Sequence, residues 1–340
     1  MGIVTLTADW HFDEYARLSG RTEDGITQRL RQILDAWKWL VDTSKEVGSE
    51  AIILAGDTWN PRTSVDIAVL DAVCRVMAET SESIPLYFLL GNHDAYMKSG
   101  LRNSLQAFRG HSVVVDTEPA TFEIAGATFG FVPWVDDPEI MERWISEITD
   151  TDPSVLITHT LVQGAIAGGN GIPLSALKSE VFDQVFLGDI HDPVQLRDNV
   201  RYLGAPLQFD YGDVEKPRGF GVYDTLTQKF EYVENVTSPR FYVVNDADNV
   251  PEFGDGDYVR IVNLDSKSAK KIGKRALAKG ANVEMLSLDE ELNDAPRLDI
   301  QTTDPHETVL RQYCEFMEVE DVDAMVEVGI TILDEVKQGI

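Results

Sequence analysis

Four of the six histidines in this chain directly follow an apolar stretch that is predicted to form a β-strand. Aspartates and one asparagine accompany them. The five pieces are Asp9-Trp10-His11, Gly56-Asp57, Gly91-Asn92-His93-Asp94, Thr158-His159 and Gly188-Asp189-Ile190-His191. Carboxylate, amide and imidazole groups are ligands for Mn²⁺, Fe²⁺, Zn²⁺ or Mg²⁺, and the lack of thiolates disfavours a structural zinc or iron–sulfur site. The pattern therefore predicts a site for divalent metal ions.

Strands and helices alternate along the part of the chain that carries these pieces. Strands are predicted at 2–8, 51–55, 86–90, 112–115, 120–124, 127–132, 154–158 and 184–187. Helices are predicted at 24–47, 64–79, near 100–109, and at 137–148. Continuous apolar strands between helices indicate an α/β sheet covered on both faces. Ligands bind outside the carboxyl ends of such strands, so we expect the five pieces to meet at one edge.

Each piece alone has an explanation without function. An Asp-x-His piece is often a capped turn, and His159 alone could be a hydrogen-bonded core histidine. The run of Asn92, His93 and Asp94 is harder to explain by packing, and five such pieces together favour a site. Trp10, between two of the polar residues, is expected to pack in the core. The two other histidines, His111 and His306, are expected at the surface.

A pair of divalent ions would suit one reaction in particular. Two ions about 3.5–4 Å apart clamp the attacking and leaving oxygens of phosphoryl transfer and activate water near neutral pH. Asp57 is the natural carboxylate to bridge such a pair. A histidine beside the ions could protonate the leaving oxygen or stabilise charge on the phosphate. The sequence therefore predicts hydrolysis of a phosphate ester.

The order D-x-H, G-D, G-N-H-D, H, G-x-x-H resembles the calcineurin-like metallophosphoesterase superfamily. More narrowly, the chain is similar to the SbcD-type nuclease subunits of SbcCD and Mre–Rad complexes and their phage homologues. That similarity rests on V-P-W at 132–134, R-Y-L-G-A-P-L-Q at 201–208 and D-V-E-K-P-R-G-F-G-V-Y-D at 213–224. It covers about 1–235. It implies an α/β fold with a β-sandwich core flanked by helices, a small β-α-β capping domain and C-terminal helices.

The resemblance also implies a role for each polar residue. One metal ion would be held by Asp9, His11, Asp57 and His191. Asp57 would bridge to a second ion, completed by Asn92, His159 and Asp189. His93 would be the catalytic histidine that contacts the phosphate, and Asp94 would orient it. The ions are expected to be Mn²⁺, with Mg²⁺ as the alternative.

Two positions depart from the family pattern. The last motif is usually G-H-x-H, and this chain has Asp189 in place of the first histidine. An aspartate adds negative charge and hardens the site, which favours Mn²⁺ or Mg²⁺ over softer ions. Asn60 stands where many members have a histidine three residues after the bridging aspartate, so the rate or polarity of cleavage could differ.

Three domains are predicted: a metallophosphoesterase domain at 1–237, a small capping or DNA-binding domain at 238–300 and a helical tail at 301–340. The second has a β-α-β pattern at 258–263, 266–279 and 282–287. Its helix carries Lys267, Lys270, Lys271, Lys274, Arg275 and Lys279. This basic face is either simply solvated or follows DNA phosphates. The tail helices, near 305–317 and 321–336, present Val309, Leu310, Tyr313, Phe316 and Met317, which either pack on their own domain or bind a coiled-coil ATPase.

Composition limits the partners. The formal charge of −29 over 340 residues argues against tight unaided DNA binding, but not against DNA chemistry, because divalent ions can supply positive charge at the phosphate. Cys74 and Cys314 fit no metal or disulfide spacing. The sequence shows no signal peptide and no apolar run long enough for a membrane span, so we expect a cytoplasmic protein, in the host cytoplasm if phage-encoded.

The function expected is a Mn²⁺-dependent DNA exonuclease and endonuclease. By resemblance, it would act on double-stranded DNA ends and single-stranded DNA, as a homodimer, with an SbcC/Rad-type ATPase in recombination, repair or phage DNA processing. One alternative is a small-molecule phosphomonoesterase or cyclic-nucleotide phosphodiesterase. Another is a catalytically weakened subunit that binds DNA ends.

Overall fold

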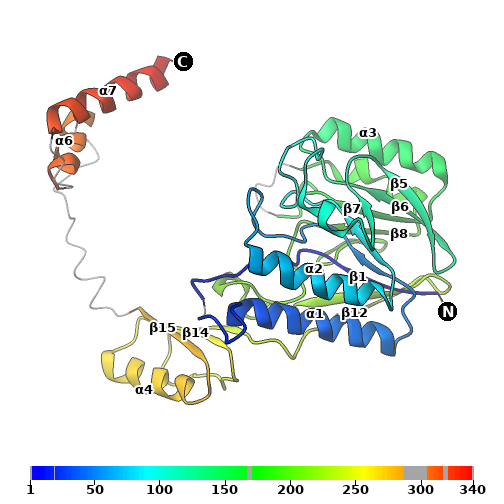
Figure 1. Ribbon diagram of the computed structural model, residues 1–340, viewed down its shortest axis with the longest axis horizontal. Coiled ribbons are helices and arrows are strands. Elements are labelled where there is room, and N and C mark those ends of the chain that lie inside the picture. The colour runs from blue at the N-terminus through cyan, green and yellow to red at the C-terminus, as the bar shows by residue number, and fades with distance from the viewer. Residues whose placement is uncertain (1, 19, 167–170, 287–304, 317–320, 339–340) are drawn as a thin grey trace. The chain divides into compact units, whose positions relative to one another are not determined.

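Two six-stranded β-sheets face each other in this protein (Figure 1). The computed structural model describes residues 2–18, 20–166, 171–286, 305–316 and 321–338. The first sheet has the order β12 (Lys229–Glu234), β11 (Gly219–Asp224), β1 (Ile3–Thr7), β2 (Ile52–Leu54), β3 (Leu86–Leu89) and β4 (Val113–Val115). The second has the order β5 (Ala120–Ile124), β6 (Ala127–Val132), β7 (Val155–His159), β8 (Gln184–Gly188), β10 (Val200–Tyr202) and β9 (Gln195–Arg197).

The strands that precede the polar pieces run parallel to one another in each sheet. In the first sheet β1, β2, β3 and β4 are parallel, and β11 and β12 are antiparallel additions at one edge. In the second sheet β6, β7, β8 and β10 are parallel, and β5 and β9 run antiparallel at the edges. Parallel strands place their carboxyl ends on the same side, so each sheet contributes its polar residues to one edge.

The two faces of each central strand pack against different layers. In β2, Ile53 packs between the sheets, whereas Ile52 and Leu54 pack against helices. In β7, Ile157 lies between the sheets and Leu156 faces the helix side. Side chains alternate along a strand, so burial on both faces gives the continuous apolar runs seen in the sequence.

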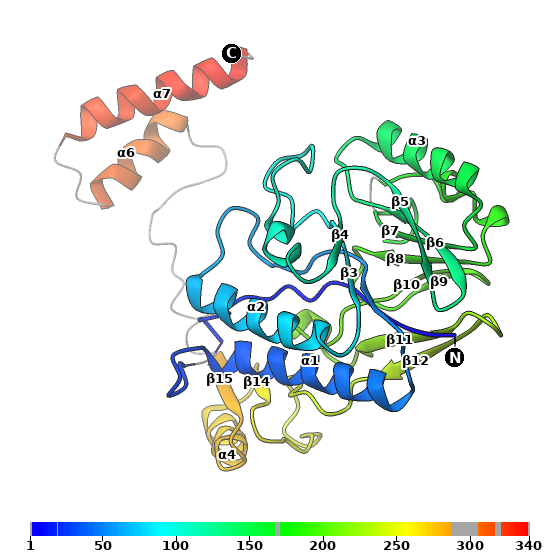
Figure 2. The ribbon, with the colours of Figure 1, turned by 45° about the vertical axis from the view of Figure 1, so that its right-hand side comes forward.

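Helices cover the outer face of each sheet (Figure 2). α1 (Gln28–Glu46) and α2 (Ile67–Ser81) cover the first sheet, and α3 (Pro138–Ile148) covers the second. The side chains of Thr27, Asp66 and Asp137 cap their N-termini by accepting backbone N–H bonds. The predicted β-sandwich flanked by helices is confirmed.

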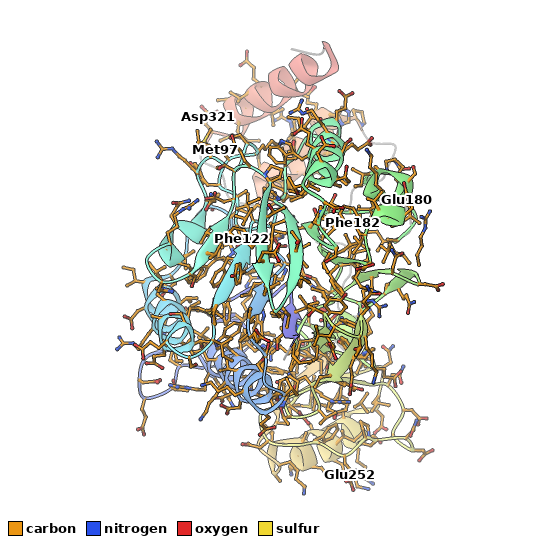
Figure 3. The ribbon with its side chains drawn as sticks, turned by 90° about the vertical axis from the view of Figure 1, so that its right-hand side faces the viewer. Met97, Phe122, Glu180, Phe182, Glu252 and Asp321 are labelled. Atoms are coloured by element: carbon orange, nitrogen blue, oxygen red, sulfur yellow. The ribbon has the colours of Figure 1, made fainter. Side chains whose placement is uncertain are left out.

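We expected an α/β sheet covered on both faces. Each sheet is indeed covered on both, by helices on one face and by the other sheet on its second face. Phe122 of β5, labelled in Figure 3, makes this inter-sheet contact: its ring centroid lies 5.5 Å from that of Tyr87 in β3. The helix expected near 100–109 is only a short 3-10 segment, Ser104–Phe108, because Leu101 points into solvent and is 69% exposed.

A third sheet has the order β13 (Phe241–Val244), β14 (Tyr258–Val262) and β15 (Asn282–Leu286), with α4 (Ser266–Leu277) between its last two strands. The tail contains α6 (His306–Phe316) and α7 (Val322–Gln338), which pack on each other. The chain divides into two compact units. The first comprises Met1–Val243, Pro251–Arg260 and Lys274–Glu284, and the rest of the described chain belongs to the second. The boundary predicted at 300/301 lies outside the described residues, and the one at 237/238 stays a prediction.

No helix in the described part of the chain combines the length and the apolar character that crossing a membrane requires.

Candidate metal centre

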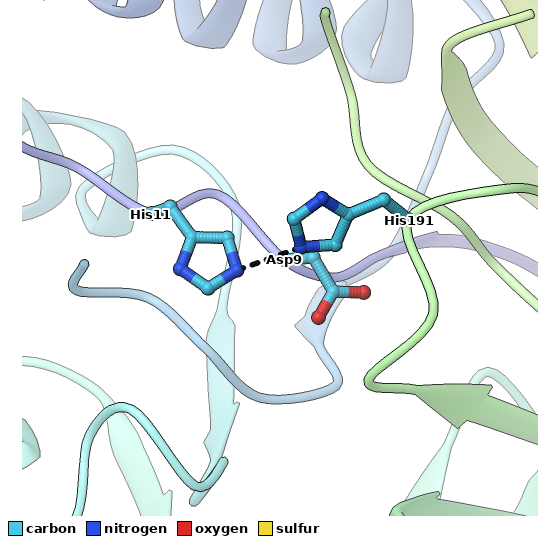
Figure 4. Close-up of side chains that lie close together, drawn as sticks. All are labelled: Asp9, His11 and His191. Carbon is cyan, nitrogen blue, oxygen red and sulfur yellow. Dashed lines mark hydrogen bonds between the residues drawn. The ribbon is translucent and has the colours of Figure 1, made fainter. Parts of the chain in front are cut away.

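The five polar pieces come together at the carboxyl ends of the strands: four of them line a pocket of about 700 Å³, and His159 of the fifth is fully buried against Asp57. Asp9 and His11 follow β1, Asp57 follows β2, Asn92, His93 and Asp94 follow β3, His159 ends β7, and Asp189 and His191 follow β8. Both sheets therefore contribute residues. Figure 4 shows Asp9 and His11, which follow β1 of the first sheet, and His191, which follows β8 of the second.

His11 lies between two other donors on one side of the pocket. Its Nε2 is 3.0 Å from Nε2 of His191 and 3.6 Å from Oδ2 of Asp57. Potential ligand atoms of Asp9, His11 and His191 all lie within 4.8 Å of one another. Two imidazole nitrogens and a carboxylate oxygen at such separations form a donor set suited to a divalent ion.

His159 organises a second group of donors on the other side. Its Nε2 lies 3.4 Å from Oδ1 of Asp57 and 3.7 Å from Oδ1 of Asp189. The amide of Asn92 lies 2.9 Å from the same nitrogen. Asp57 thus presents one oxygen to His11 and the other to His159, which is the arrangement that a bridging carboxylate requires.

The backbone holds the ring of His159 in one orientation. Its Nδ1 lies 2.8 Å from the carbonyl oxygen of Ala55, so Nδ1–H donates to that carbonyl in the neutral ring. The lone pair is then on Nε2, which faces Asp57. A hydrogen bond to one ring nitrogen that leaves the other for a metal is the usual arrangement of a metal-ligating histidine.

Four of the nine predicted residues adopt a left-handed backbone conformation: φ is 55° at Asp9, 45° at His11, 52° at Asp57 and 103° at Asp189. Residues other than glycine seldom adopt positive φ, and strained positions of this kind cluster at functional sites. The bends turn the chain sharply after each strand, so that neighbouring polar side chains face the same pocket.

Burial destabilises the charged forms of several of these groups. It raises the pKa of Asp9 well above its usual value, and the nearby Asp57 and Asp189 add to this effect. Burial also raises the pKa of Asp189. It lowers the pKa of His11 to about 3 and lowers that of His191, so both rings are neutral near pH 7.

The pair of Asp57 and His159 behaves in the opposite way. Burial alone would lower the pKa of His159, but Asp57 outweighs it and raises the pKa to about 10. Burial alone would raise the pKa of Asp57, but His159 and then His11 hold it below its usual value. The protonated His159 therefore lies beside three buried or largely buried aspartates, Asp9, Asp57 and Asp189.

The donor set fits divalent metal ions. Among the described residues, three groups bring their ligand atoms within 4.8 Å of one another inside each group: Asp9–His11–His191, His11–Asp57–His93 and Asp9–Asp57–His159. They offer only oxygen and imidazole nitrogen, and the carboxylates lack enough positive charge around them. A divalent cation would supply that charge.

A family model described as calcineurin-like phosphoesterase matches residues 3–193, which is more than half of the chain. The chain belongs to the calcineurin-like phosphoesterase family. It is also 24% identical, over 246 residues, to exonuclease subunit 1 of Enterobacteria phage T4. That match covers 70% of this chain and 69% of the phage protein. Membership of the family implies divalent metal ions.

Solved structures similar to this phosphoesterase are more distant. A dimetal phosphatase from Danio rerio is 12% identical with a TM-score of 0.45, and the match covers 68% of this chain and 95% of the phosphatase. A protein from Thermus thermophilus is 15% identical with a TM-score of 0.44, over 68% of this chain and 98% of the other.

His93 is held from two sides. Its backbone N–H donates to Oδ1 of Asp57 (2.8 Å), and its Nδ1 lies 2.7 Å from the carbonyl oxygen of Asn60. The resemblance implied that Asp94 would orient this ring, and that role stays a prediction. The described bonds of Asp94 run to the backbone N–H groups of Trp59 and Gly91, both 3.0 Å, so it joins the two loops that carry Asp57 and His93. Burial, with Asp57, raises the pKa of Asp94 to about 7.

Phe209, Tyr15 and Arg62 lie at the site but were not predicted. The ring of Phe209 lies 5.7 Å from that of His11 and 5.8 Å from that of His191, and Tyr15 stacks on its other side at 5.9 Å. Arg62 contacts the amide of Asn92. Phe209 directly follows the R-Y-L-G-A-P-L-Q segment, so the motif pointed to its neighbourhood without identifying the residue.

The residues set aside in the sequence lie elsewhere. Trp10 is fully buried against Phe12 and Trp37, as expected for packing, and is inaccessible to a base. His111 lies half-buried in a turn beside Ser112, and His306 is exposed at the start of α6. Neither belongs to the groups of metal donors in the described residues.

Proposed function

We propose that this phosphoesterase is a metal-dependent DNA nuclease that hydrolyses phosphodiester bonds with two divalent ions, Mn²⁺ or Mg²⁺. The observation that carries the proposal is the placement of Asp57 between the donors around His11 and those around His159, with His93 at the edge. The similarity to a phage exonuclease subunit supports DNA as the substrate.

Different residues of the chain would bind each of the two ions. Asp9, His11 and His191 would hold one ion, Asn92, His159 and Asp189 the other, and Asp57 both. Two such ions supply Lewis acidity at the phosphate and lower the pKa of water so that it can attack near neutral pH. The strained backbone at Asp9, His11 and Asp57 fixes the donors in advance.

His93 would donate a proton to the leaving oxygen or hydrogen-bond to the phosphate. The Asn60 carbonyl fixes Nδ1, so Nε2 is the ring atom that can donate a proton to the leaving oxygen or hydrogen-bond to the phosphate. Since the Asp57 carboxylate also accepts the backbone N–H of His93, the ring is held close to the donors without having to be one of them.

The approach of DNA would use the basic residues of α4. Five exposed basic residues lie on α4 and a sixth follows it, in an otherwise very acidic chain: Lys267, Lys270, Lys271, Lys274 and Arg275, then Lys279. Cationic side chains bind DNA by releasing its counterions. We propose that α4 binds the duplex backbone near an end, and that single-stranded DNA is also bound.

The helical tail would bind a coiled-coil ATPase of the SbcC/Rad type. Leu310 of α6 packs against Gly329 of α7, whereas Tyr313, Met325 and Val328 are each more than half exposed. Exposed apolar side chains at helical spacing are the usual anchors of helix-in-groove binding. Homodimerisation is part of the same proposal and rests on the family resemblance.

The acidic rim of the pocket favours one alternative. Asp13, Glu14, Asp66 and Asp210 line the pocket beside the metal donors and would repel the flanking phosphates of a long strand. A small phosphomonoester or cyclic-nucleotide phosphodiester has no flanking phosphates, so an enzyme for small molecules is the second candidate.

The test supplies purified protein with Mn²⁺ and offers it linear duplex DNA, single-stranded DNA and p-nitrophenyl phosphate esters. DNA cleavage that EDTA abolishes is expected. Turnover of small esters without DNA cleavage would favour the alternative, and DNA binding without any cleavage would favour a catalytically weakened subunit.

Two histidine variants sharpen the test. His93→Ala is expected to lower cleavage by about 100-fold or more while Mn²⁺ binding, measured by calorimetry, persists. His111→Ala removes the same side chain outside the site and is expected to cut normally. Equal rates for the two variants would contradict the role of His93.

A further inference from the structure

The ring of His11 is held differently from the rings of His159 and His93. Each of those two has Nδ1 close to a backbone carbonyl oxygen, at 2.8 Å and 2.7 Å respectively. Nδ1 of His11 is buried and has no hydrogen-bond partner among the described residues. A metal-ligating histidine is usually oriented by a hydrogen bond at its second ring nitrogen. Since His11 lacks that bond, packing must orient its ring.

Phe209 supplies this packing. Its ring meets that of His11 edge to face, with the centroids 5.7 Å apart and the planes at 90°. The ring of His191, which lies beside that of His11 in Figure 4, is 5.8 Å from the same phenyl ring. Edge-to-face contact is a favoured and directional arrangement of aromatic rings. One phenyl ring therefore contacts two of the imidazoles that are proposed to hold an ion.

Phe209 is itself held by a buried arginine. Phe209 lies outside the helices and strands, so regular secondary structure does not fix it. Arg29, the second residue of α1, is fully buried, and its guanidinium carbon lies 6.0 Å from the centroid of the Phe209 ring. The guanidinium also donates to the carbonyl oxygen of Gln208 and to Oε1 of Gln32. Arg29 thus contacts both the ring of Phe209 and the backbone just before it.

The same guanidinium packs on two rings of the third sheet. Its carbon lies 5.4 Å from the ring centroids of Phe241 in β13 and Tyr258 in β14, and these two rings stack at 4.5 Å. All of these residues belong to the first compact unit. A guanidinium is attracted to the faces of aromatic rings, more strongly where water is excluded. Arg29 is therefore the cation that Phe209, Phe241 and Tyr258 surround.

Packing alone does not require a cation at this position. Burying a charge is costly, and an apolar side chain of similar volume would fill the space at a lower cost. The guanidinium adds direction, because its planar set of donors fixes a carbonyl while its charge holds the rings. We propose that Arg29 is a positioning residue of the metal centre, which fixes the ring of Phe209 and through it the imidazoles of His11 and His191. The proposal rests on the proposed binding of divalent ions at these histidines, but not on DNA as the substrate.

Two core variants serve as matched controls for Phe209→Leu and Arg29→Met. Phe129→Leu makes the same change as Phe209→Leu in a fully buried ring between the sheets, where β6 pairs with the first residue of β7. Arg201→Met removes a half-buried guanidinium that lies 4.3 Å from the centroid of the Phe230 ring, outside the lining of the pocket. Both controls are expected to unfold at lower urea concentration than wild type and to bind Mn²⁺ as wild type does.

Mn²⁺ affinity, measured by calorimetry, is the first readout and needs no activity. Phe209→Leu and Arg29→Met are each expected to bind Mn²⁺ about 10-fold more weakly than their controls, because the support of two ligands is lost. Arg29→Lys should recover part of the affinity, since it restores the charge without the planar donors. If the variants are less stable but bind Mn²⁺ as tightly as the controls, Arg29 only stabilises the fold and the proposal is overturned. Should Arg29→Met fail to fold, Arg29→Lys is compared with Arg201→Met, and equal affinities overturn the proposal.

The double variant tests whether Arg29 acts through Phe209. If it does, Arg29→Met with Phe209→Leu should bind Mn²⁺ about 10-fold more weakly than wild type, as each single variant does. A loss of about 100-fold would mean that the two residues act independently, which contradicts the proposed path. The visible spectrum of Co²⁺-loaded protein reports the geometry of the ligands. It should change in both single variants and stay the same in both controls.

The outcome is separate from the fate of the nuclease proposal. If wild type binds Mn²⁺ but cleaves neither DNA nor small esters, the nuclease proposal fails, and the Mn²⁺ affinities still decide the role of Arg29. If wild type cleaves DNA and the variants bind Mn²⁺ as tightly as their controls, only the role of Arg29 fails. Wild type that binds neither Mn²⁺ nor Co²⁺ would overturn both.

Discussion

Gly56 lies so close to His159 that any side chain would collide with the ring. A Cβ on Gly56 would lie 2.1 Å from Nδ1 of His159, and the backbone φ of Gly56 is +97°. The glycine of the G-D motif therefore serves two needs at once: it turns the chain before Asp57 and leaves room for the imidazole.

Gly56→Ala is accordingly expected to displace His159 from the Ala55 carbonyl. We expect a loss of about 3 kcal/mol or more in the free energy of unfolding, from collision together with backbone strain, and weaker Mn²⁺ binding. Gly25→Ala is the control: Gly25 has φ +89° with nothing within 4 Å of the added Cβ, so it isolates the strain at about 1 kcal/mol. Urea unfolding and calorimetry measure both. Equal losses for the two variants would show that the collision does not matter.

Metal binding is expected to stabilise the whole sandwich, because the donors come from strands of both sheets. At a free Mn²⁺ concentration 100-fold above Kd, the free energy of unfolding should rise by about 2.7 kcal/mol. Thermal unfolding with Mn²⁺ and with EDTA measures the difference. A melting temperature that does not respond to Mn²⁺ would contradict a metal site at these residues.

Asp9→Asn distinguishes the effect of the negative charge of Asp9 from the effect of its hydrogen bond. Burial and two neighbouring carboxylates make the charged form of Asp9 costly, whereas its oxygens accept the backbone N–H of Asp189 at 3.1 and 3.3 Å. An asparagine oxygen keeps the hydrogen bond without the charge. We therefore expect the metal-free variant to melt above metal-free wild type and to gain little from Mn²⁺. A lower melting temperature in EDTA would show that the charge of Asp9 stabilises the fold.

The predictability of the site has a physical limit. Asp9, Asp57, His159 and His191 could be predicted because each follows a recognisable apolar strand, and carboxyl ends of parallel strands meet. Arg62 could not, because it lies in a loop and its contact with Asn92 is one that no periodicity reveals. The orientation of His93 was missed for a related reason: its partner is the backbone carbonyl of Asn60, and every residue has one.

The sequence also predicts the strands of the fold but not the layers that cover them. The uniformly apolar β2 indicated burial on both faces, but the sequence does not distinguish a helix from a second sheet as the covering layer, since Ile52 and Ile53 suit both. The prediction of a helix near 100–109 was wrong. Leu105 and Phe108 are buried, but too few apolar residues follow them at helical spacing for a longer helix to bury one face.

The departure at Asn60 is expected to matter little for the orientation of His93. The contact to His93 is made by the Asn60 carbonyl, and the Asn60 side chain donates to Asp13 instead (2.7 Å). Asn60→Ala should therefore keep cleavage close to the wild-type rate and lose about 1 kcal/mol of stability. Loss of cleavage comparable to that in His93→Ala would mean that the side chain itself takes part.

Replacing Asp94, unlike replacing Asn60, is expected to lower both stability and cleavage. Asp94→Ala removes the acceptor for two buried backbone N–H groups, those of Trp59 and Gly91, and should cost about 3 kcal/mol. Because these N–H groups belong to the loops that carry Asp57 and His93, cleavage should fall as well. Asp94→Asn keeps one acceptor and should be intermediate in both. Urea unfolding and the rate of cleavage test this order, and full activity of Asp94→Ala would refute it.

Arg218 lies outside the proposed metal donors but is joined to the loops that carry them. Its guanidinium, 2% exposed, contacts Asp192 at 2.9 Å and Asp213 at 2.5 Å, and Asp213 in turn accepts the backbone N–H of Phe209. Since Asp192 follows His191, the arginine joins the loop of a proposed ligand to the aromatic wall of the pocket. Arg218→Ala leaves the buried Asp213 without its cation and should cost about 3 kcal/mol.

Arg240 is the control that distinguishes the role of Arg218 from a general effect of removing a positive charge. Arg240 pairs with Glu234 at the surface, 43% and 50% exposed, so Arg240→Ala should change stability by less than about 0.5 kcal/mol. Urea unfolding compares the two variants, and Mn²⁺ titration reports on His191. If Arg218→Ala unfolds earlier but binds Mn²⁺ as tightly as Arg240→Ala, the arginine stabilises the fold without positioning His191. Weakened Mn²⁺ binding in the folded variant would establish that the P-R-G-F segment supports the metal centre from behind.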